Sequence, residues 1–176
     1  MTSNHKIYWS PFFHDGLRVD LSHLEPFDFT CLENRRRVAV IFGQHTFTRG
    51  LESGDDPTKR CFDNRIFCPE RYALSHNLPS VVSGLPGSKV YQTWEANAYV
   101  TIASVVLVGT ENYHVFLTAK RDDLSKKVKR VRLTIESAYV DNASNYLSES
   151  KPHSIKFENL IENTFMGRPI VFHRNK

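Results

Sequence analysis

The residues best suited to chemistry are His114 and Glu136, with Arg132 and Lys120 in the same stretch of chain. Histidine and glutamate can transfer protons near neutral pH, and lysine and arginine can stabilise the negative charge that develops on a phosphate group. The acid, the base and the cations that metal-independent cleavage of RNA needs can all come from His, Glu, Arg, Lys and Tyr on a sheet face. We therefore predict His114, Glu136 and Arg132 as catalytic residues.

A second candidate set follows the apolar segment 38–42. In the sequence QHTFTR at 44–49, His45 and Arg49 would share one face if a strand continued through them. A histidine could then act as acid or base while the arginine holds a phosphate, so we add both to the predicted catalytic residues. The alternative for His45 is a hydrogen-bonded histidine at a polar strand end.

Positive charge is concentrated between residues 120 and 132, which contain seven lysines or arginines and two aspartates. This segment has a net charge of +5 in a chain of +4, so the remaining residues sum to about −1. Such a basic stripe favours a phosphate-bearing partner. The alternative is an exposed hairpin whose charges protect a sheet edge from aggregation. The predicted nucleic-acid contacts are Lys120, Arg121, Lys126, Lys127, Lys129 and Arg130.

Three predicted strands would position these groups. The segment 98–108 is apolar or small almost throughout, which is typical of an interior strand. The segments 113–120 and 128–140 alternate, so a hairpin between them should turn their apolar odd-numbered residues toward the core. This register places His114 near Thr134 and Glu136 on the opposite face. The site is thus a prediction from alternation and not from a motif.

The rest of the chain predicts a single α+β domain over residues 1–176, with an antiparallel sheet, a meander in its C-terminal half and two or three short helices packed on it. Residues 38–42 should form a strand and 90–94 a short edge strand. Helices are indicated at 69–77, where Pro69 occupies the first position, and at 155–166, before Gly167. Arg65, Arg71, Tyr72 and His76 could face a ligand or a solvated surface.

Several classes of function have no motif in this sequence. The nucleotide-binding glycine loops and the signatures of zinc proteases, serine hydrolases and kinases are absent. The spacing of Cys61, Cys68 and His76 does not match a structural zinc site, so we predict no metal and no cofactor. Three cysteines suggest reduced thiols and a cytoplasmic location, and no stretch predicts a membrane partner.

The meander from Ala98 to Val140 resembles the RelE, barnase and colicin class of small metal-independent ribonucleases, in which a curved sheet presents basic and titratable residues. The likeness is one of topology and covers roughly a quarter of the chain. It implies a toxin-like enzyme that acts on RNA. The alternative is a non-catalytic module that binds nucleic acid, or an acidic protein, through its basic hairpin and Arg35–Arg37. A third possibility is a protein contact through the aromatic N-terminal segment.

Overall fold

The structure is a computed structural model that describes residues 8–93, 98–106, 110–123, 129–140, 153–171 and 173–174. Its first half contains β1 (Phe12–His14), β2 (Leu17–Val19), the 3-10 turn η1 (Ser22–Leu24), β3 (Phe27–Cys31), β4 (Arg36–His45), β5 (Thr48–Arg49), η2 (Pro57–Lys59), η3 (Phe62–Asn64) and β6 (Ile66–Phe67). The second half contains α1 (Pro69–Ser75), α2 (Leu78–Ser83), β7 (Lys89–Gln92), β8 (Ala98–Val106), β9 (Thr110–Asp123), β10 (Lys129–Val140), β11 (His153–Lys156), α3 (Phe157–Met166) and β12 (His173–Arg174). The α+β prediction is confirmed.

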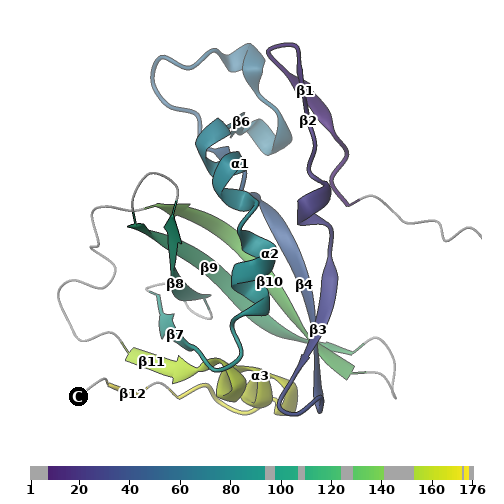
Figure 1. The fold of residues 1–176 in the computed structure, drawn as a ribbon, viewed down its shortest axis with the longest axis vertical. Helices are drawn as coiled ribbons and strands as arrows, with labels where there is room; N and C mark the ends of the chain where they lie inside the picture. The colour runs from purple at the N-terminus through teal and green to yellow at the C-terminus, as the bar shows by residue number, and fades with distance from the viewer. Residues whose placement is uncertain are drawn as a thin grey trace, which may run out of the picture.

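Eight of these strands form one sheet in the order β12-β11-β7-β8-β9-β10-β4-β3 (Figure 1). The predicted meander is its centre, because β8, β9 and β10 pair antiparallel with their neighbours in sequence. One feature was not predicted: β4 pairs with β10 in parallel, so residues 36–45 insert beside a strand almost a hundred positions later. The segment expected as an edge strand, β7, instead lies between β11 and β8.

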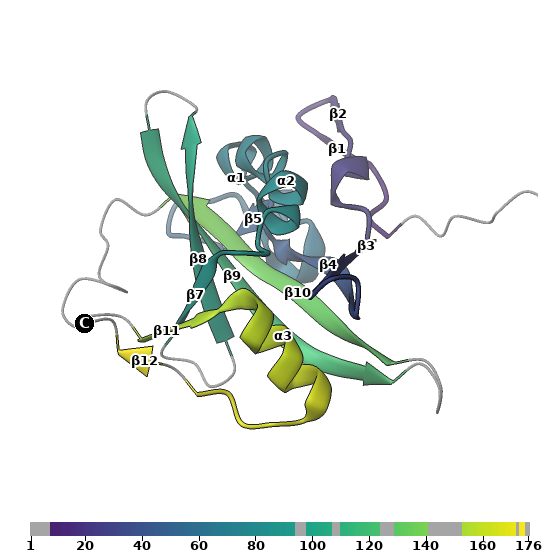
Figure 2. The ribbon, with the colours of Figure 1, turned by 60° about the horizontal axis from the view of Figure 1, so that its bottom comes forward.

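The core lies between one face of the sheet and its helices. Helix α3 crosses β9 and β10 (Figure 2), and Leu74 of α1 with Leu78 and Val82 of α2 belongs to the same buried cluster. Phe157, Leu160 and Ile161 are buried at helical spacing on α3, and they meet the buried odd-numbered residues of β9 and β10. Gly167 ends the helix with φ 66°, a left-handed conformation that favours glycine. At the other end of the sheet, the rings of Trp9, Phe62 and their neighbours meet edge to face beneath the β1–β2 hairpin.

The predicted register of the β9–β10 hairpin is correct only for its first half. Leu133 pairs with Ala119 and Ile135 with Leu117, but a bulge then leaves Glu136 without a partner in the ladder. Beyond the bulge the parity of β10 is reversed, so that Ala138 is buried and Tyr139 pairs with His114. Thr134 pairs with Thr118 even before the bulge, four residues along β9 from His114, so the predicted placement of His114 near Thr134 is wrong.

The other face of the sheet carries a ladder of ion pairs across four strands. Asp28 on β3 pairs with Arg37 on β4 and lies 3.7 Å from Arg130 on β10. Asp122 on β9 accepts hydrogen bonds from Arg130 and Arg132, each at 2.9 Å. Two of the basic residues in the charged hairpin are thus matched by carboxylates within the protein.

None of the helices in the described ranges has the length and apolar content needed to cross a membrane.

Candidate functional site

Two arginines converge on one carbonyl oxygen where β4 ends. Arg71, on α1, donates from Nη1 to the carbonyl oxygens of His45 and Thr48 at 3.1 and 3.0 Å. Arg65, just before β6, donates from Nε to Thr48 Oγ1 at 2.8 Å and from Nη2 to the Thr48 carbonyl at 3.3 Å. These acceptors belong to a tight turn after Gly43, in which the Thr48 hydroxyl donates back to the Gln44 carbonyl at 2.7 Å.

Neither guanidinium has a carboxylate partner among the described residues. A carbonyl oxygen accepts the hydrogen bond but leaves the positive charge in place. Both side chains are half-buried, so their charges are only partly screened by solvent. Burial lowers the pKa of Arg65, and the neighbouring charge of Arg71 lowers it further. The pair is therefore a local excess of positive charge that an anion would relieve.

His45 borders this pair and lies opposite Ser137 in the parallel ladder. Burial, followed by repulsion from Arg65 and Arg71, lowers the pKa of its imidazole, while Glu136 opposes the shift. His45 is therefore neutral at pH 7 and can accept a proton. Since the residue as a whole is exposed, an external ligand can reach it.

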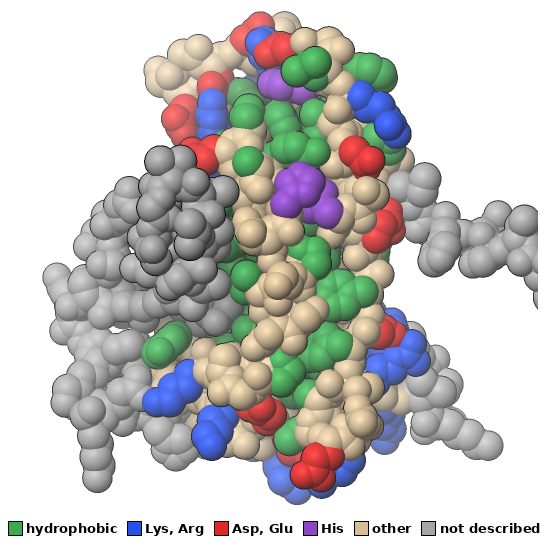
Figure 3. Space-filling view, in the orientation of Figure 1, with side chains coloured by type: hydrophobic (Ala, Val, Ile, Leu, Met, Phe, Trp, Pro, Cys, Tyr) green, Lys and Arg blue, Asp and Glu red, His purple; other side chains and the backbone are tan. Residues whose placement is uncertain are grey.

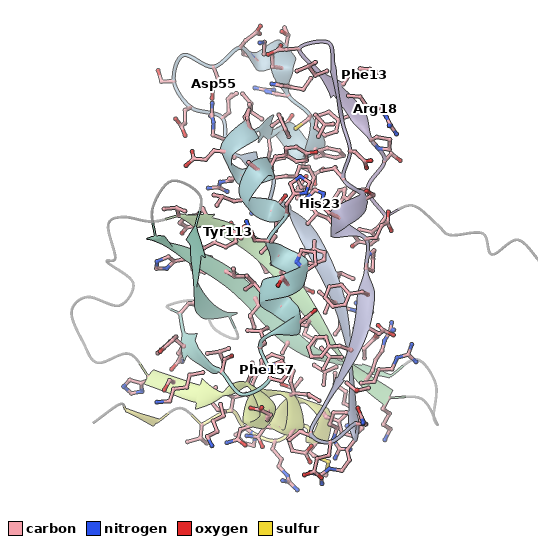
Figure 4. All side chains as sticks on the ribbon, in the orientation of Figure 1. Phe13, Arg18, His23, Asp55, Tyr113 and Phe157 are labelled. Carbon is pink, nitrogen blue, oxygen red and sulfur yellow. The ribbon has the colours of Figure 1, made fainter. Side chains whose placement is uncertain are left out.

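Two tyrosines lie close to the arginine pair. The Arg71 guanidinium lies 5.0 Å from the ring centre of Tyr139. Tyr113 lies at the end of the sheet nearest α1 (Figure 4), is fully buried, and its hydroxyl has no hydrogen-bond partner within the described part of the chain. Burial raises the pKa of Tyr113, and the nearby charge of Arg71 acts against this shift. Both tyrosines come from the β9–β10 end that lies beside the arginine pair.

The first predicted site is not assembled as expected. His114 is only 1% exposed and pairs with Tyr139, whereas Glu136 accepts a hydrogen bond from Thr118 at 2.9 Å. Arg132 is turned toward Asp122, on the ion-pair ladder. The prediction failed because Thr134 pairs with Thr118 and not with His114, and because a bulge between Ile135 and Ser137 then shifts the pairing by one further residue.

The predicted pairing of His45 with Arg49 is also wrong. The strand ends at His45 and a turn intervenes before β5, so the two side chains do not share one strand face. Arg49 instead binds Asp55 with two hydrogen bonds of 2.6 Å, one from each terminal nitrogen. This pairing lowers the pKa of the Asp55 carboxyl to about 2. Arg49 therefore fastens the loop after β5, and His45 belongs with Arg65 and Arg71.

The basic hairpin lies far from the arginine pair. Lys120 and Lys129 are exposed, as is Arg121, at the end of the hairpin opposite to Tyr113. Eight residues along β9 separate Tyr113 from Arg121, which is about 26 Å of extended strand. Lys126 and Lys127 lie outside the described residues. The chain thus has two basic regions at opposite ends of β9.

Cys61, Cys68 and His76 do not form a metal site: in the described ranges no three His, Cys, Asp or Glu side chains are grouped closely enough to hold an ion. All three cysteines are free thiols. Arg65 and Arg71 were among the polar residues noted in the sequence, but nothing there indicated that both would meet Thr48. The parallel pairing of β4 with β10 brings that turn beside α1, and it has no local sequence signal.

The chain belongs to the YjaZ family, whose model matches residues 11–165. The match covers β1 through most of α3 and so includes the arginine pair and His45. No curated protein and no solved structure shows significant similarity to this chain.

Proposed function

We propose that the protein binds RNA through Arg65 and Arg71, which contact the phosphate backbone. The observation that supports this proposal is the pair of half-buried guanidiniums that share the Thr48 carbonyl and have no carboxylate partner among the described side chains. Guanidinium groups are well suited to phosphate because several N–H donors lie in one plane. The excess of positive charge between residues 120 and 132 supports a polyanion over a single small anion.

The test measures the affinity of a labelled oligouridylate for the protein in EDTA, by fluorescence anisotropy. The variant is Arg71→Gln, because glutamine can still donate to the carbonyls of His45 and Thr48 but has no charge. Arg18→Gln is the matched control, since Arg18 is exposed on the β1–β2 hairpin (Figure 4) and the change in net charge is the same. We expect Arg71→Gln to weaken binding about tenfold, as loss of a charged hydrogen bond of about 1.5 kcal/mol would.

Equal effects of Arg71→Gln and Arg18→Gln would contradict the proposal, because binding would then depend on net charge alone. Circular dichroism of both variants establishes that they are folded. An acidic peptide of similar charge density is the comparison ligand. If it bound more tightly than the oligouridylate, the partner would be an acidic protein and not RNA.

A second candidate function is metal-independent cleavage of that RNA, and the specific observation in its favour is His45. Its lowered pKa makes it a base at pH 7, beside two cations that could stabilise a charged phosphorane. The imidazole would take the proton of a ribose 2′-hydroxyl, and the 2′-oxygen would bond to phosphorus. The bond from phosphorus to the 5′-oxygen would break, that oxygen would take a proton from water, and the hydroxide left would take the proton back from the imidazolium. The products would be a 2′,3′-cyclic phosphate and a 5′-hydroxyl.

Cleavage is tested with labelled RNA in EDTA, separated on a denaturing gel. We expect wild-type protein to release products with a cyclic phosphate, and His45→Gln to lose this activity about a hundredfold while it still binds RNA. His114→Gln serves as the comparison, because His114 was the other predicted catalytic histidine. Intact RNA in the wild-type lane would exclude the ribonuclease and leave the binding function.

A further inference from the structure

Two stacked histidines lie on the side of helix α1 opposite to Arg71. The imidazoles of His23, in η1, and His76, just after α1, are 3.7 Å apart and inclined by 19°. Figure 4 labels His23 at this position, and Figure 3, in the same orientation, shows a histidine patch there on the surface. The ring of Tyr72 meets both imidazoles edge to face, with centres 5.6 and 5.1 Å away. The stack joins η1 to α1, elements that are about fifty residues apart in sequence.

Hydrogen bonds fix which ring nitrogen of His23 donates to Ser75. Nε2 of His23 lies 2.7 Å from Ser75 Oγ, and that hydroxyl donates its own proton to the Tyr72 carbonyl at 2.7 Å. Because Ser75 is thus an acceptor toward the imidazole, Nε2 of His23 carries a proton. Ser75 is fully buried, so no solvent can replace this partner. The Tyr72 hydroxyl adds a bond to the Asp20 carbonyl at 2.9 Å.

The same helix presents Arg71 to the anion site. Helix α1 has only seven residues, too few to be stable without tertiary contacts. On one side Arg71 bonds to the turn after β4, and on the other Tyr72, Ser75 and His76 dock against η1. A shift of the helix away from η1 would therefore move the Arg71 guanidinium relative to Arg65.

Charge on the stack opposes this docking. Two imidazolium ions at 3.7 Å repel each other, and η1 and α1 contribute no carboxylate side chain to the stack. The carboxylates nearest to His23 in sequence already accept backbone amides: Glu25 accepts that of Tyr8 at 3.1 Å, and Asp20 accepts that of Ser22 at 2.9 Å. Burial, then repulsion from His76, lowers the pKa of His23 to about 4, while Asp20 acts weakly in the opposite direction. The docked helix therefore favours the neutral stack.

We propose that His23 and His76 are positioning residues for Arg71, and that protonation of their stack releases α1 and weakens RNA binding. This inference rests on the proposed function of the arginine pair. It assigns a pH-dependent control to that site from residues that do not contact the ligand. Protonation of His45, within the site, would have the opposite effect because it adds positive charge beside the phosphate.

The test follows the affinity for an oligouridylate between pH 7.5 and pH 4.5 at constant ionic strength. Uracil and the phosphodiester do not titrate in this range. The protein carries His45→Gln throughout, so that only the stack is compared. Against this background we add His23→Gln with His76→Phe, because glutamine can still donate to Ser75 and phenylalanine can still stack without a charge. We expect the affinity to fall about tenfold on acidification with the native stack, a coupling of ordinary size, and less than twofold without it.

Equal losses of affinity with and without the two substitutions would overturn the inference, as would unchanged affinity at pH 4.5 with the native stack. A second readout does not depend on RNA. The Nε–H resonance of Arg71 in the NMR spectrum should shift with the titration of His23 and stay constant in the variant. If RNA binding fails at pH 7.5 but this resonance moves with His23, the proposed function is wrong while the positioning role stands. If the Nε–H resonance of Arg71 stays constant while His23 titrates, the positioning role is wrong.

Discussion

At the scale of single residues, the partner of each arginine decides its role. Arg36 binds Glu162 at 2.6 Å and Arg49 binds Asp55 at the same distance, so both charges are matched and both residues fasten one segment to another. Arg65 and Arg71 meet carbonyl oxygens instead and keep an unmatched charge. The sequence shows where the arginines are, but their partners lie up to 126 positions away. The alternating pattern along a strand therefore could not distinguish arginines that form internal ion pairs from arginines that are candidates to bind a ligand.

The turn between β3 and β4 contains residues with positive φ, which allows a prediction about the stability of a glycine variant. Leu32, Glu33 and Asn34 all have positive φ, at 53°, 54° and 65°. Asparagine tolerates this region, whereas a glutamate with its Cβ is strained there by about 1–2 kcal/mol. Glu33 is exposed, so its side chain can be removed without loss of packing. We predict that Glu33→Gly raises the free energy of unfolding by up to about 1 kcal/mol, because relief of strain exceeds the added freedom of the unfolded chain.

Chemical denaturation measures this difference. Glu33→Ala is the control, since alanine retains the Cβ and should give no gain. A glycine variant less stable than the wild type would contradict the strained conformation of this turn.

At the scale of elements, the bulge in β10 explains why the predicted site was only partly correct. The alternating pattern correctly identified β9 and β10 and the odd-numbered core residues before the bulge, including Leu117 and Leu133. An extra residue at Glu136 then reversed the parity, and no feature of the sequence marked it. His114 and Glu136 were consequently assigned to a shared site that does not form. The strands and helices could be predicted locally, whereas the long-range parallel pairing that brings His45 to Arg71 could not.

The same bulge depends on Gly43 of β4. A Cβ at this position would lie 3.1 Å from the carbonyl oxygens of both Ile135 and Glu136, and these are backbone atoms that cannot rotate away. We predict that Gly43→Ala lowers the free energy of unfolding by about 1–3 kcal/mol, the usual cost of an overpacked contact. It should also weaken RNA binding, because His45 and the turn to Thr48 follow directly.

Gly50→Ala is the matched control, since a Cβ there would meet no atom within 4 Å. Thermal or urea denaturation of both variants measures the effect. Equal stability of the two variants would show that β4 and β10 do not approach as closely as described.

At the scale of the whole molecule, acid should destabilise the protein in two stages. The folded state lowers the pKa of His23 from 6.5 to about 4, so between these values the unfolded state binds more protons and stability falls as the pH drops. Asp122 and Glu162 also have lowered pKa values because arginines bind them, and their contributions are present above the usual carboxyl pKa and lost below it. We predict a first decline beginning near pH 6.5 and a second below about pH 4.

Urea denaturation at a series of pH values tests this order. His23→Gln should reduce the first decline and leave the second, while the lowered pKa of His45 still contributes to the first. If the variant and the wild type lose stability in parallel from pH 6.5 to pH 4.5, the histidine stack does not control folding in that range.

Two basic regions at opposite ends of β9 also bear on how a long ligand would bind. The arginines of the ion-pair ladder are largely matched by Asp28 and Asp122, whereas the half-buried arginine pair beside His45 has no carboxylate partner in the part of the chain that the structure describes. Composition predicted a phosphate-bearing partner but assigned it to the basic hairpin. We propose the arginine pair as the contact surface for the same class of ligand.

The most direct test of the account is the salt dependence of RNA affinity in wild-type protein and in the double variant Arg65→Gln with Arg71→Gln. Each phosphate contact on single-stranded RNA adds about 0.7 to the slope of log affinity against log salt concentration. We predict that the double variant loses about 1.4 from this slope, whereas a variant with Arg18→Gln and Arg37→Gln keeps the wild-type slope. Unchanged slopes in the Arg65 and Arg71 variant would contradict the claim that these two arginines bind phosphate.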